Sequence, residues 1–255
     1  MSDGVIKLSF DEYNHAWQQT EGEVIEEGFV SIFVNGAELA TVMCSPRDQD
    51  RLALGFLCNE GIINSIDDVR AIHVCPSGAC VDVWLKRSDF VRPNRLILTS
   101  GCGGGVTFDD LTKTIEPLNS DRLISPAKIS ALMNAMQQNA ALYARARGVH
   151  TSALSDGEKL IALAEDVGRH NTIDKLRGAC LIEKIDPSGL ILLCTGRISS
   201  EMINKVARMG CPIVASRTSP TSLSVKLARE WNITLIGYLR RESMRVYAHP
   251  ERLKN

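Results

Sequence analysis

Alternating apolar and polar positions characterise the first part of the chain. Residues 29 to 43 alternate around Asn35-Gly36, a sequence typical of a two-residue hairpin turn between two strands. Apolar positions then recur at helical spacing from Pro46 to about Glu60, and Gly61 stands where a helix cap belongs. Further short strands are predicted at 69 to 75, 79 to 86 and 95 to 99. The pattern therefore predicts a small β-rich unit that contains one helix.

The second part of the chain alternates between apolar runs and helical patterns. Ser125-Pro126 has the N-cap and first-turn proline of a helix, which is predicted to reach about Arg147. Short apolar runs then predict strands at 151 to 155, 159 to 164, 190 to 194, 212 to 215 and 233 to 239. Helical patterns lie between the later runs, at 169 to 184, 199 to 209 and 220 to 230. Such alternation predicts a mostly parallel sheet covered by helices.

These two patterns together predict an α/β protein, α+β overall, with two domains. A β-rich domain is expected over residues 1–120, and a larger domain with the mostly parallel sheet over residues 121–255. Residues 100 to 122 show little periodicity and carry three consecutive glycines, so they are expected to form a loop and linker.

Composition and charge narrow the class of protein. The 255 residues are 44% hydrophobic and 23% charged, which is typical of folded domains large enough to need no cross-links. The formal net charge is −1, so no global field attracts a nucleic acid or an anionic membrane. The first residues lack a basic segment followed by an apolar run, and we therefore expect a cytoplasmic protein with reduced thiols.

Loops rich in glycine and polar residues follow three predicted strands of the second domain, each before a predicted helix. They span residues 165–171, 194–201 and 216–222. Loops that leave parallel strands in this way gather at one edge of a sheet, where ligands bind. Free N–H groups at helix N-termini, together with one arginine per loop, predict a site for phosphate or another anion. Any one of these loops taken alone is better explained as a helix cap, and it is the convergence of three that favours a site.

Cys102 differs from the other seven cysteines of the chain. Most of those lie among apolar neighbours, where free cysteine behaves as a small buried hydrophobe. Cys102 instead lies in Ser100-Gly101-Cys102-Gly103-Gly104-Gly105, which offers no apolar cover. An accessible thiol reacts as its thiolate, and the N–H groups of a glycine-rich turn stabilise that charge. We predict a sulfur nucleophile, with an exposed cysteine of no function as the alternative.

A metal site is not expected from the remaining cysteines and histidines. Cys75 and Cys80 have a spacing just within the range of structural zinc sites, but no second Cys or His pair of similar spacing lies nearby. His150 and His170 remain candidate bases, although a lone histidine is more often structural.

Several segments, in this order along the chain, resemble the FdhD/NarQ family of formate dehydrogenase accessory sulfurtransferases. They include Arg51–Leu57, Asn59–Ile63, the Cys102 loop, Gly148–Leu154, Glu165–Asn171 with Asp174-Lys175, Thr195–Ser199, Ser219–Leu223 and Gly237–Arg240. The resemblance implies a cytoplasmic homodimer whose larger domain is a three-layer fold similar to cytidine deaminase. The deaminase zinc motif, His-x-Glu with Pro-Cys-x-x-Cys, is absent, so neither zinc nor deamination is expected.

The resemblance also implies partners and roles. Cys102 is expected to accept sulfur from a cysteine desulfurase as a persulfide and to pass it to the molybdenum cofactor of formate dehydrogenase, a bis-molybdopterin guanine dinucleotide. A guanine nucleotide is expected to mimic this cofactor. The expected cofactor-binding residues are Asp166, Gly168, Arg169, His170, Asn171, Asp174, Thr195, Gly196, Arg197, Ser199, Ser219, Ser222, Tyr238, Leu239, Arg240, Arg241, Glu242 and Ser243.

One departure from the family pattern concerns the thiol loop. The family sequence is Cys-Gly-x-Cys-Gly, whereas Gly105 here stands in place of the second cysteine. Any step that needs a second thiol in this loop has no partner thiol for Cys102. The missing cysteine supports one alternative, a non-catalytic chaperone that binds the molybdenum cofactor. A second alternative is an inactive deaminase-like protein that binds guanine nucleotides.

Overall fold

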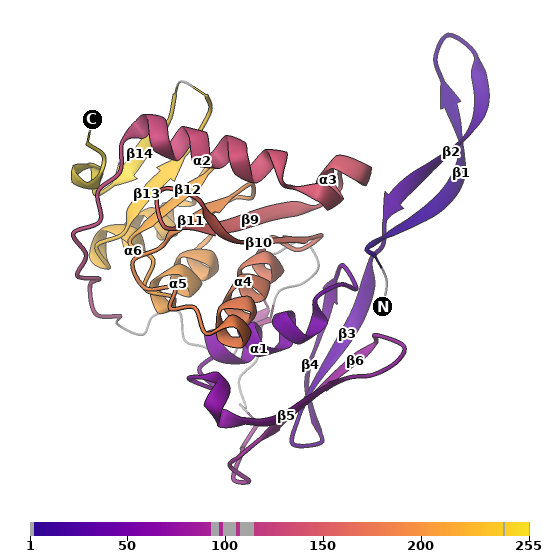
Figure 1. Ribbon diagram of the computed structural model, residues 1–255, viewed down its shortest axis with the longest axis horizontal. Coiled ribbons are helices and arrows are strands. Elements are labelled where there is room, and N and C mark those ends of the chain that lie inside the picture. The colour runs from indigo at the N-terminus through magenta and orange to yellow at the C-terminus, as the bar shows by residue number, and fades with distance from the viewer. Residues whose placement is uncertain (1–2, 93–96, 99–105, 108–114, 242, 255) are drawn as a thin grey trace.

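A six-stranded mixed sheet forms the centre of the larger part of the structure, a computed structural model (Figure 1). The strands are β9 (His150–Ser155), β10 (Leu160–Asp166), β11 (Ile191–Cys194), β12 (Ile213–Ser216), β13 (Thr234–Gly237) and β14 (Arg245–Ala248), in the order β10-β9-β11-β12-β13-β14. The structure describes residues 3–92, 97–98, 106–107, 115–241 and 243–254.

Parallel pairing is confined to the middle of this sheet. The strands β11, β12 and β13 run parallel, whereas β9, β10 and β14 pair antiparallel with their neighbours. All four residues of each of the three parallel strands are buried, as expected for strands covered on both faces. At one edge the predicted parallel sheet is replaced by the antiparallel pair of β9 and β10, because the short turn that joins these strands permits only antiparallel pairing.

Helices cover both faces of the sheet, so this part of the chain has three layers. One face packs against α4 (Arg169–Glu183), α5 (Ser200–Arg208) and α6 (Ser222–Glu230), and the other against α2 (Pro126–Gln138). Alternate residues of β11 serve the two layers: Leu192 belongs to the core of the first, and Ile191 and Leu193 to the core of the second. The α/β class and the three-layer arrangement are confirmed.

The helix predicted from residue 125 to residue 147 is two helices. After α2, the chain breaks at Asn139 and Ala140, and α3 (Ala141–Ala146) begins in a new direction. The side-chain amide of Asn139 donates to the Ala135 carbonyl at 2.8 Å, and such a bond competes with continuation of the helix.

A four-stranded sheet with one helix forms the smaller part, as predicted. Its strands are β3 (Gly28–Val34), β4 (Ala37–Cys44), β5 (Val69–Val74) and β6 (Cys80–Leu85), in the order β4-β3-β6-β5, with α1 (Gln49–Asn59) packed on them. Asn35 and Gly36 both have positive φ, at 50° and 81°, which confirms the predicted hairpin turn.

Short elements complete the described chain. They are the pair β7 (Ile97–Leu98) and β8 (Val106–Thr107) and the 3-10 helices η1 (Ile66–Asp68) and η2 (Pro250–Arg252). The domain boundary placed near residue 120 stays a prediction.

The sequence analysis missed a two-stranded ribbon at the N-terminus. β1 (Val5–Tyr13) pairs with β2 (Trp17–Ile25), and the ribbon projects away from both sheets (Figure 1). Ile6, Leu8 and Phe10 lie on one face of the ribbon and are each more than two-fifths exposed. Their alternation with polar residues was the available signal for β1. At the base of the ribbon, Arg145 of α3 forms ion pairs with Asp3 and Glu23.

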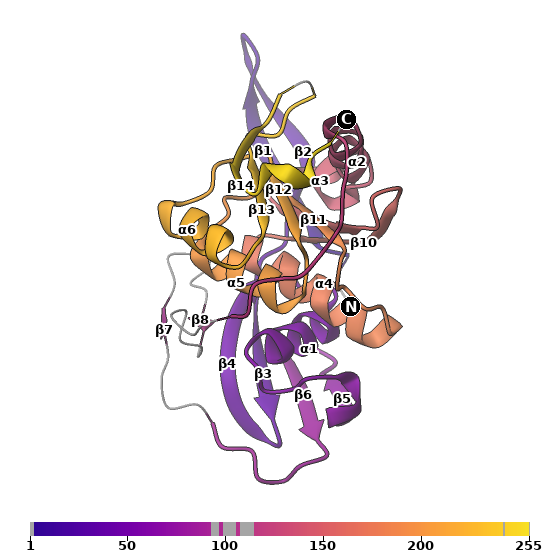
Figure 2. The ribbon, with the colours of Figure 1, turned by 90° about the vertical axis from the view of Figure 1, so that its left-hand side faces the viewer.

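Two glycines bring α1 and α4 into backbone contact, and thereby join the two parts of the molecule (Figure 2). A Cβ added at Gly55 would lie 1.7 Å from the Asp174 carbonyl oxygen, and one at Gly178 would lie 1.9 Å from the Arg51 carbonyl oxygen. Only glycine permits this approach, because the atoms met are backbone atoms that no side-chain rotation can move.

Replacing Gly178 with alanine should therefore destabilise the protein by about 3 kcal/mol or more, since the two helices must separate. Urea unfolding followed by circular dichroism measures this loss. Ile182→Ala, on the exposed side of the same helix, is the control and should change stability by less than about 0.5 kcal/mol. Equal stabilities of the two variants would contradict the proposed backbone contact.

Candidate functional site

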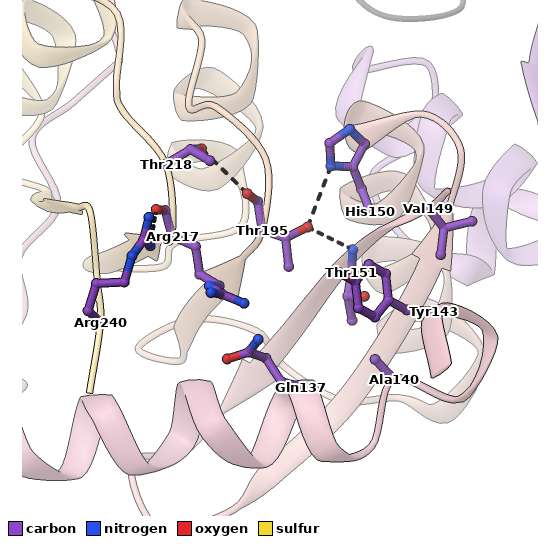
Figure 3. Close-up of a pocket in the computed structure, with 10 residues that line it drawn as sticks. All are labelled: Gln137, Ala140, Tyr143, Val149, His150, Thr151, Thr195, Arg217, Thr218 and Arg240. Carbon is purple, nitrogen blue, oxygen red and sulfur yellow. Dashed lines mark hydrogen bonds between the residues drawn. The ribbon is translucent and has the colours of Figure 1, made fainter. Parts of the chain in front are cut away.

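A cavity of about 370 Å³ opens at the carboxyl ends of the parallel strands, facing α2 and α3 (Figure 3). It is lined by Gln137, Ala140, Tyr143, Val149, His150, Thr151, Thr195, Arg217, Thr218 and Arg240. This edge is where open α/β sheets bind ligands, because successive strand-to-helix loops converge there.

The residues that follow each parallel strand line the cavity. Thr195 follows β11, Arg217 and Thr218 follow β12, and Arg240 lies three residues beyond β13. The Tyr238 N–H donates to the Thr218 carbonyl at 3.0 Å, which fixes the chain after β13 against the chain after β12. The Arg240 guanidinium donates to the Arg217 carbonyl at 2.5 Å, so these two loops meet at the cavity (Figure 3).

Hydroxyl groups and an imidazole form the wall beside β9. The Thr151 N–H donates to Thr195 Oγ1 at 3.1 Å, and His150 Nδ1 lies 3.5 Å from the same oxygen (Figure 3). The hydroxyl of Thr218 donates to the Thr195 carbonyl at 3.4 Å. Behind this wall, a Cβ at Gly196 would lie 3.2 Å from His150 Nδ1, so the absence of a side chain at Gly196 leaves room for the imidazole.

The charge of the cavity comes from arginine. Burial lowers the pKa of His150, and the nearby Arg169 guanidinium lowers it further, so this imidazole is neutral at neutral pH. The ten described lining residues include Arg217 and Arg240 but no carboxylate. The cavity therefore offers two permanent positive charges with neutral hydrogen-bonding groups, a combination suited to phosphate.

A second hollow of about 440 Å³ adjoins the first. It is lined by Ser130, Met133, Asn134, Gln137, Arg217, Leu239, Arg240 and Arg241. Gln137, Arg217 and Arg240 line both spaces, so the two arginines lie between them. Together the two hollows suit a ligand that has an anionic group in its middle and a further group on each side.

Some predicted site residues meet at these cavities. Thr195 and Arg240 line the first, and Leu239, Arg240 and Arg241 line the second. Gly196 lies directly behind the wall of the first, against Arg169 and His150. The sequence analysis did not select Gln137 or Thr218; Thr218 lies in the recognised loop after β12, whereas nothing in α2 marks Gln137 as a site residue.

Other predicted residues lie at the same edge without lining either hollow. Ser199 caps α5 by accepting from the Met202 N–H at 3.3 Å, and Gly168 precedes α4 as its N-cap. The Tyr238 ring stacks on the Arg245 guanidinium, and the Ser243 carbonyl accepts from the Arg240 N–H at 2.7 Å. Three further predicted residues at this edge are Arg197 and Ser222, which are exposed, and Ser219, which is half-buried. Glu242 lies outside the described residues.

The loop before α4 is buried and holds the molecule together. Asp166 pairs with Lys175 at 2.6 Å and also accepts from the Ser45 N–H at 3.1 Å and the Asn171 amide at 2.8 Å. His170 is 5% exposed, and burial lowers its pKa to about 2, so the ring is neutral. Its Nε2 lies 3.1 Å from Ser199 Oγ.

A second buried ion pair lies deeper, between α4 and α5. Lys205 Nζ lies 2.7 Å from Asp174 Oδ2, and the Asn59 amide of α1 donates to Asp174 Oδ1 at 2.7 Å. Asp174 thus has internal partners on α1 and α5. The sequence analysis missed Ser45, Asn59 and Lys205 because each partner lies far along the chain from the carboxylate that it contacts.

The buried cysteines fit their interpretation as small hydrophobes. Burial raises the pKa of Cys44 and Cys194 to about 12 and that of Cys180 to about 11. Cys75 and Cys80 are the half-exposed exceptions among the described cysteines. Cys102 itself lies outside the described residues.

The described residues contain no group of three or more His, Cys, Asp or Glu side chains that could hold a metal ion. None of the described helices combines the length and the apolar character that a membrane crossing requires.

Comparisons with known proteins agree with this architecture. Residues 25–254 match the model of the FdhD/NarQ family. The sulfur carrier protein FdhD of Bacillus subtilis (strain 168) is 36% identical over 255 residues, covering 93% of this chain and 95% of that protein. The protein of the same name from Staphylococcus haemolyticus is 34% identical over 241 residues, covering 92% of this chain and 91% of that protein.

A solved structure is similar over the whole chain. It is a crystal structure of a protein from Desulfotalea psychrophila assigned as a formate dehydrogenase accessory protein. The TM-score is 0.81 at 28% sequence identity, and the match covers 98% of this chain and 99% of that chain.

The buried ion pair leads to a test of whether Asp174 stabilises the fold. Asp174→Asn should lower stability by about 3 to 5 kcal/mol, because it leaves the Lys205 ammonium buried without its carboxylate. The double variant Asp174→Asn with Lys205→Met should recover part of this loss, because the buried ammonium is removed as well. Recovery stays incomplete because Glu201, 3.9 Å from Lys205, loses the same cation. Urea unfolding at pH 7 measures both.

Glu230→Gln is the matched control, because it removes the carboxylate of the exposed pair with Lys226 and should cost less than about 1 kcal/mol. If Asp174→Asn is no more harmful than this control, the ion pair does not have the structural role assigned to it.

Proposed function

Because the chain belongs to the FdhD/NarQ family, we propose that it carries sulfur to the molybdenum cofactor of formate dehydrogenase, a bis-molybdopterin guanine dinucleotide bound as substrate. Relatives named as sulfur carrier proteins match nearly the whole chain, and a similar structure is assigned as a formate dehydrogenase accessory protein. The cavity at the carboxyl ends of β11, β12 and β13 is the observation that carries the binding part of this proposal.

The cavity supports binding of the nucleotide end of the cofactor. Arg217 and Arg240 line both hollows, so a diphosphate between them would leave space for a group on either side. Planar guanidinium groups suit phosphate oxygens because they donate two parallel hydrogen bonds. Thr195, Thr218 and the neutral His150 add hydrogen-bonding groups without further charge. A guanine nucleotide such as GDP would fill the same position.

The sulfur would travel on Cys102. The thiolate of Cys102 attacks the terminal sulfur of a persulfide on a cysteine desulfurase, a sulfur–sulfur bond forms on Cys102, and the donor thiolate leaves. This exchange involves no net oxidation or reduction. With Gly105 in place of a second cysteine, the bound sulfur has no thiol at that position to attack it. A single-cysteine carrier is therefore the form of sulfurtransferase that we propose.

We place the protein in the cytoplasm, where its sulfur donor and client would lie, as a homodimer. The exposed apolar side chains of Ile6, Leu8 and Phe10 on one face of the β1–β2 ribbon support a surface that is covered by a second copy. Light scattering of the full chain measures the mass, and a monomer at all concentrations would exclude this assembly.

Sulfur loading tests the role of Cys102. Incubation with cysteine and an active desulfurase should add one sulfur atom to the protein by intact mass, on the peptide that contains Cys102. Cys102→Ala should abolish this addition, whereas Cys80→Ala should retain it. A Cys102→Ala protein that still supports formate dehydrogenase maturation would instead favour the non-catalytic chaperone.

Nucleotide binding tests the cavity separately. Arg217→Gln and Arg240→Gln should each weaken GDP binding by about 10- to 100-fold, the loss expected for a hydrogen bond to a charged group. Calorimetry at one fixed salt concentration measures it. Lys226→Gln, which removes one exposed charge from α6, should leave binding within about twofold. Equal weakening by all three variants would assign the effect to net charge and not to the cavity.

A further inference from the structure

Two cysteines face each other across the turn between β5 and β6. Val74 pairs with Val81 at the end of the hairpin, and Cys75 and Cys80 occupy the next opposed positions. The Cys75 N–H donates to the Cys80 carbonyl at 3.0 Å, which fixes the two residues side by side. Opposed residues joined by such a hydrogen bond have Cα atoms roughly 5.5 Å apart. A disulfide needs about 4.4 to 6.8 Å, so little backbone movement is required.

The turn between the two cysteines is anchored to α1. Gly78 has a positive φ of 71° and donates its N–H to the Cys75 carbonyl at 2.8 Å. Its own carbonyl accepts from the side-chain amide of Gln49, at 2.9 Å. Gln49 is 2% exposed at the start of α1, so the turn is anchored to the core of the smaller part of the molecule. The two thiols are thus held close together in the reduced protein.

Hydrogen-bond donors converge on one of the two sulfurs. The Cys80 N–H lies 3.0 Å from Cys75 Sγ, and the Ser77 hydroxyl lies 3.2 Å from it. The Cys80 thiol and the Ser77 hydroxyl lower the pKa of Cys75 to about 7, while Cys75 raises the pKa of Cys80. Cys75 is therefore the first to ionise, and Cys80 retains its proton.

Few other charges face the pair. His73 and Asp82 form the cross-strand pair two residues away on the same face, and Asp82 acts further to keep Cys80 protonated. On the neighbouring strand, Ser31 of β3 lies beside Cys80 in the parallel register and is neutral. Both cysteines are half-exposed, in contrast to the buried Cys44, Cys58, Cys180, Cys194 and Cys211.

We propose that Cys75 and Cys80 form a dithiol site for exchange with low-molecular-weight disulfides, in which Cys75 is the attacking thiol and Cys80 the resolving thiol. The Cys75 thiolate attacks one sulfur of the small disulfide, forming a mixed disulfide and releasing one thiolate. The Cys80 thiol then loses its proton to solvent and attacks Cys75 Sγ, which closes the internal disulfide and releases the second thiolate. Two protein thiols are oxidised and one small disulfide is reduced to two thiols.

This site is independent of the sulfur-carrying role proposed for Cys102, and its test removes that residue. Reduced full-length Cys102→Ser protein is incubated with oxidised glutathione at pH 7, and its mass and peptide map are measured. We expect the loss of two hydrogens and a peptide linkage between Cys75 and Cys80. With Cys80→Ser added, the reaction should stop at one glutathionyl group on Cys75. With Cys75→Ser added, neither product should form at a comparable rate.

The order of attack is tested by alkylation. The rate of iodoacetamide labelling at Cys75 should rise with pH to a midpoint near 7, because the thiolate is the reactive form. Ser77→Ala removes one donor and should move this midpoint upward, with labelling at pH 7 slowed by at least about twofold. Circular dichroism of each variant confirms that it is folded.

Three results would overturn the proposal. They are accumulation of the glutathionyl adduct without an internal disulfide in the Cys102→Ser protein, equal reaction after Cys75→Ser, and faster labelling of Cys80 than of Cys75. Because Cys102 is absent throughout, failure of this test leaves sulfur loading at Cys102 unaffected, and failure of sulfur loading leaves this test unaffected.

Discussion

The backbone contact between α1 and α4 is the constraint on which the arrangement of the molecule depends. Gly55 and Gly178 let the two helices approach until carbonyl oxygens occupy the space of absent Cβ atoms. At that distance the side chains around the crossing are fixed as well, and Asn59 reaches Asp174. The helix of the four-stranded sheet is thereby placed under the helical layer of the six-stranded sheet (Figure 2). The loop before α4, which borders the candidate site, is held from both sides.

The buried charges around this contact show why polar residues at strand ends are ambiguous in a sequence. Asp166 precedes α4 in the kind of loop that binds anions and Asp174 lies in the first turns of that helix, but their oxygens accept hydrogen bonds from Ser45 and Asn59. A carboxylate that is fully buried requires such partners, or its charge would be too costly to keep. Residues that hold a binding loop and residues that bind its ligand therefore have the same chemistry and occur side by side. Only the fold separates the inward-facing set from Arg217 and Arg240, which line the cavity.

Local patterns predicted most of the helices and the strands of the two main sheets, but they missed the β1–β2 ribbon and β14 and did not fix how the strands pair or where α2 ends. The turn at Asn35-Gly36 and the helices after β10, β11 and β12 follow from periodicity and capping. The antiparallel edges of the large sheet depend on the length of the β9–β10 connection, and the break at Asn139 depends on one side-chain hydrogen bond. Likewise, the loop after β12 was recognisable as a site, but Gln137 reaches the cavity from a helix that carries no chemical motif.

The contact between α1 and α4 also has a consequence for biosynthesis. Ser45 and the Asp166 carboxylate that it contacts are 121 residues apart in the chain. A ribosome adds about 5 to 20 residues per second, so the partner of the N-terminal sheet is made roughly 6 to 24 s later. During that interval α1 lacks the helix against which it finally packs. The face of α1 around Gly55 then remains open to other proteins. A chaperone that covers this face until α4 emerges would protect the nascent chain.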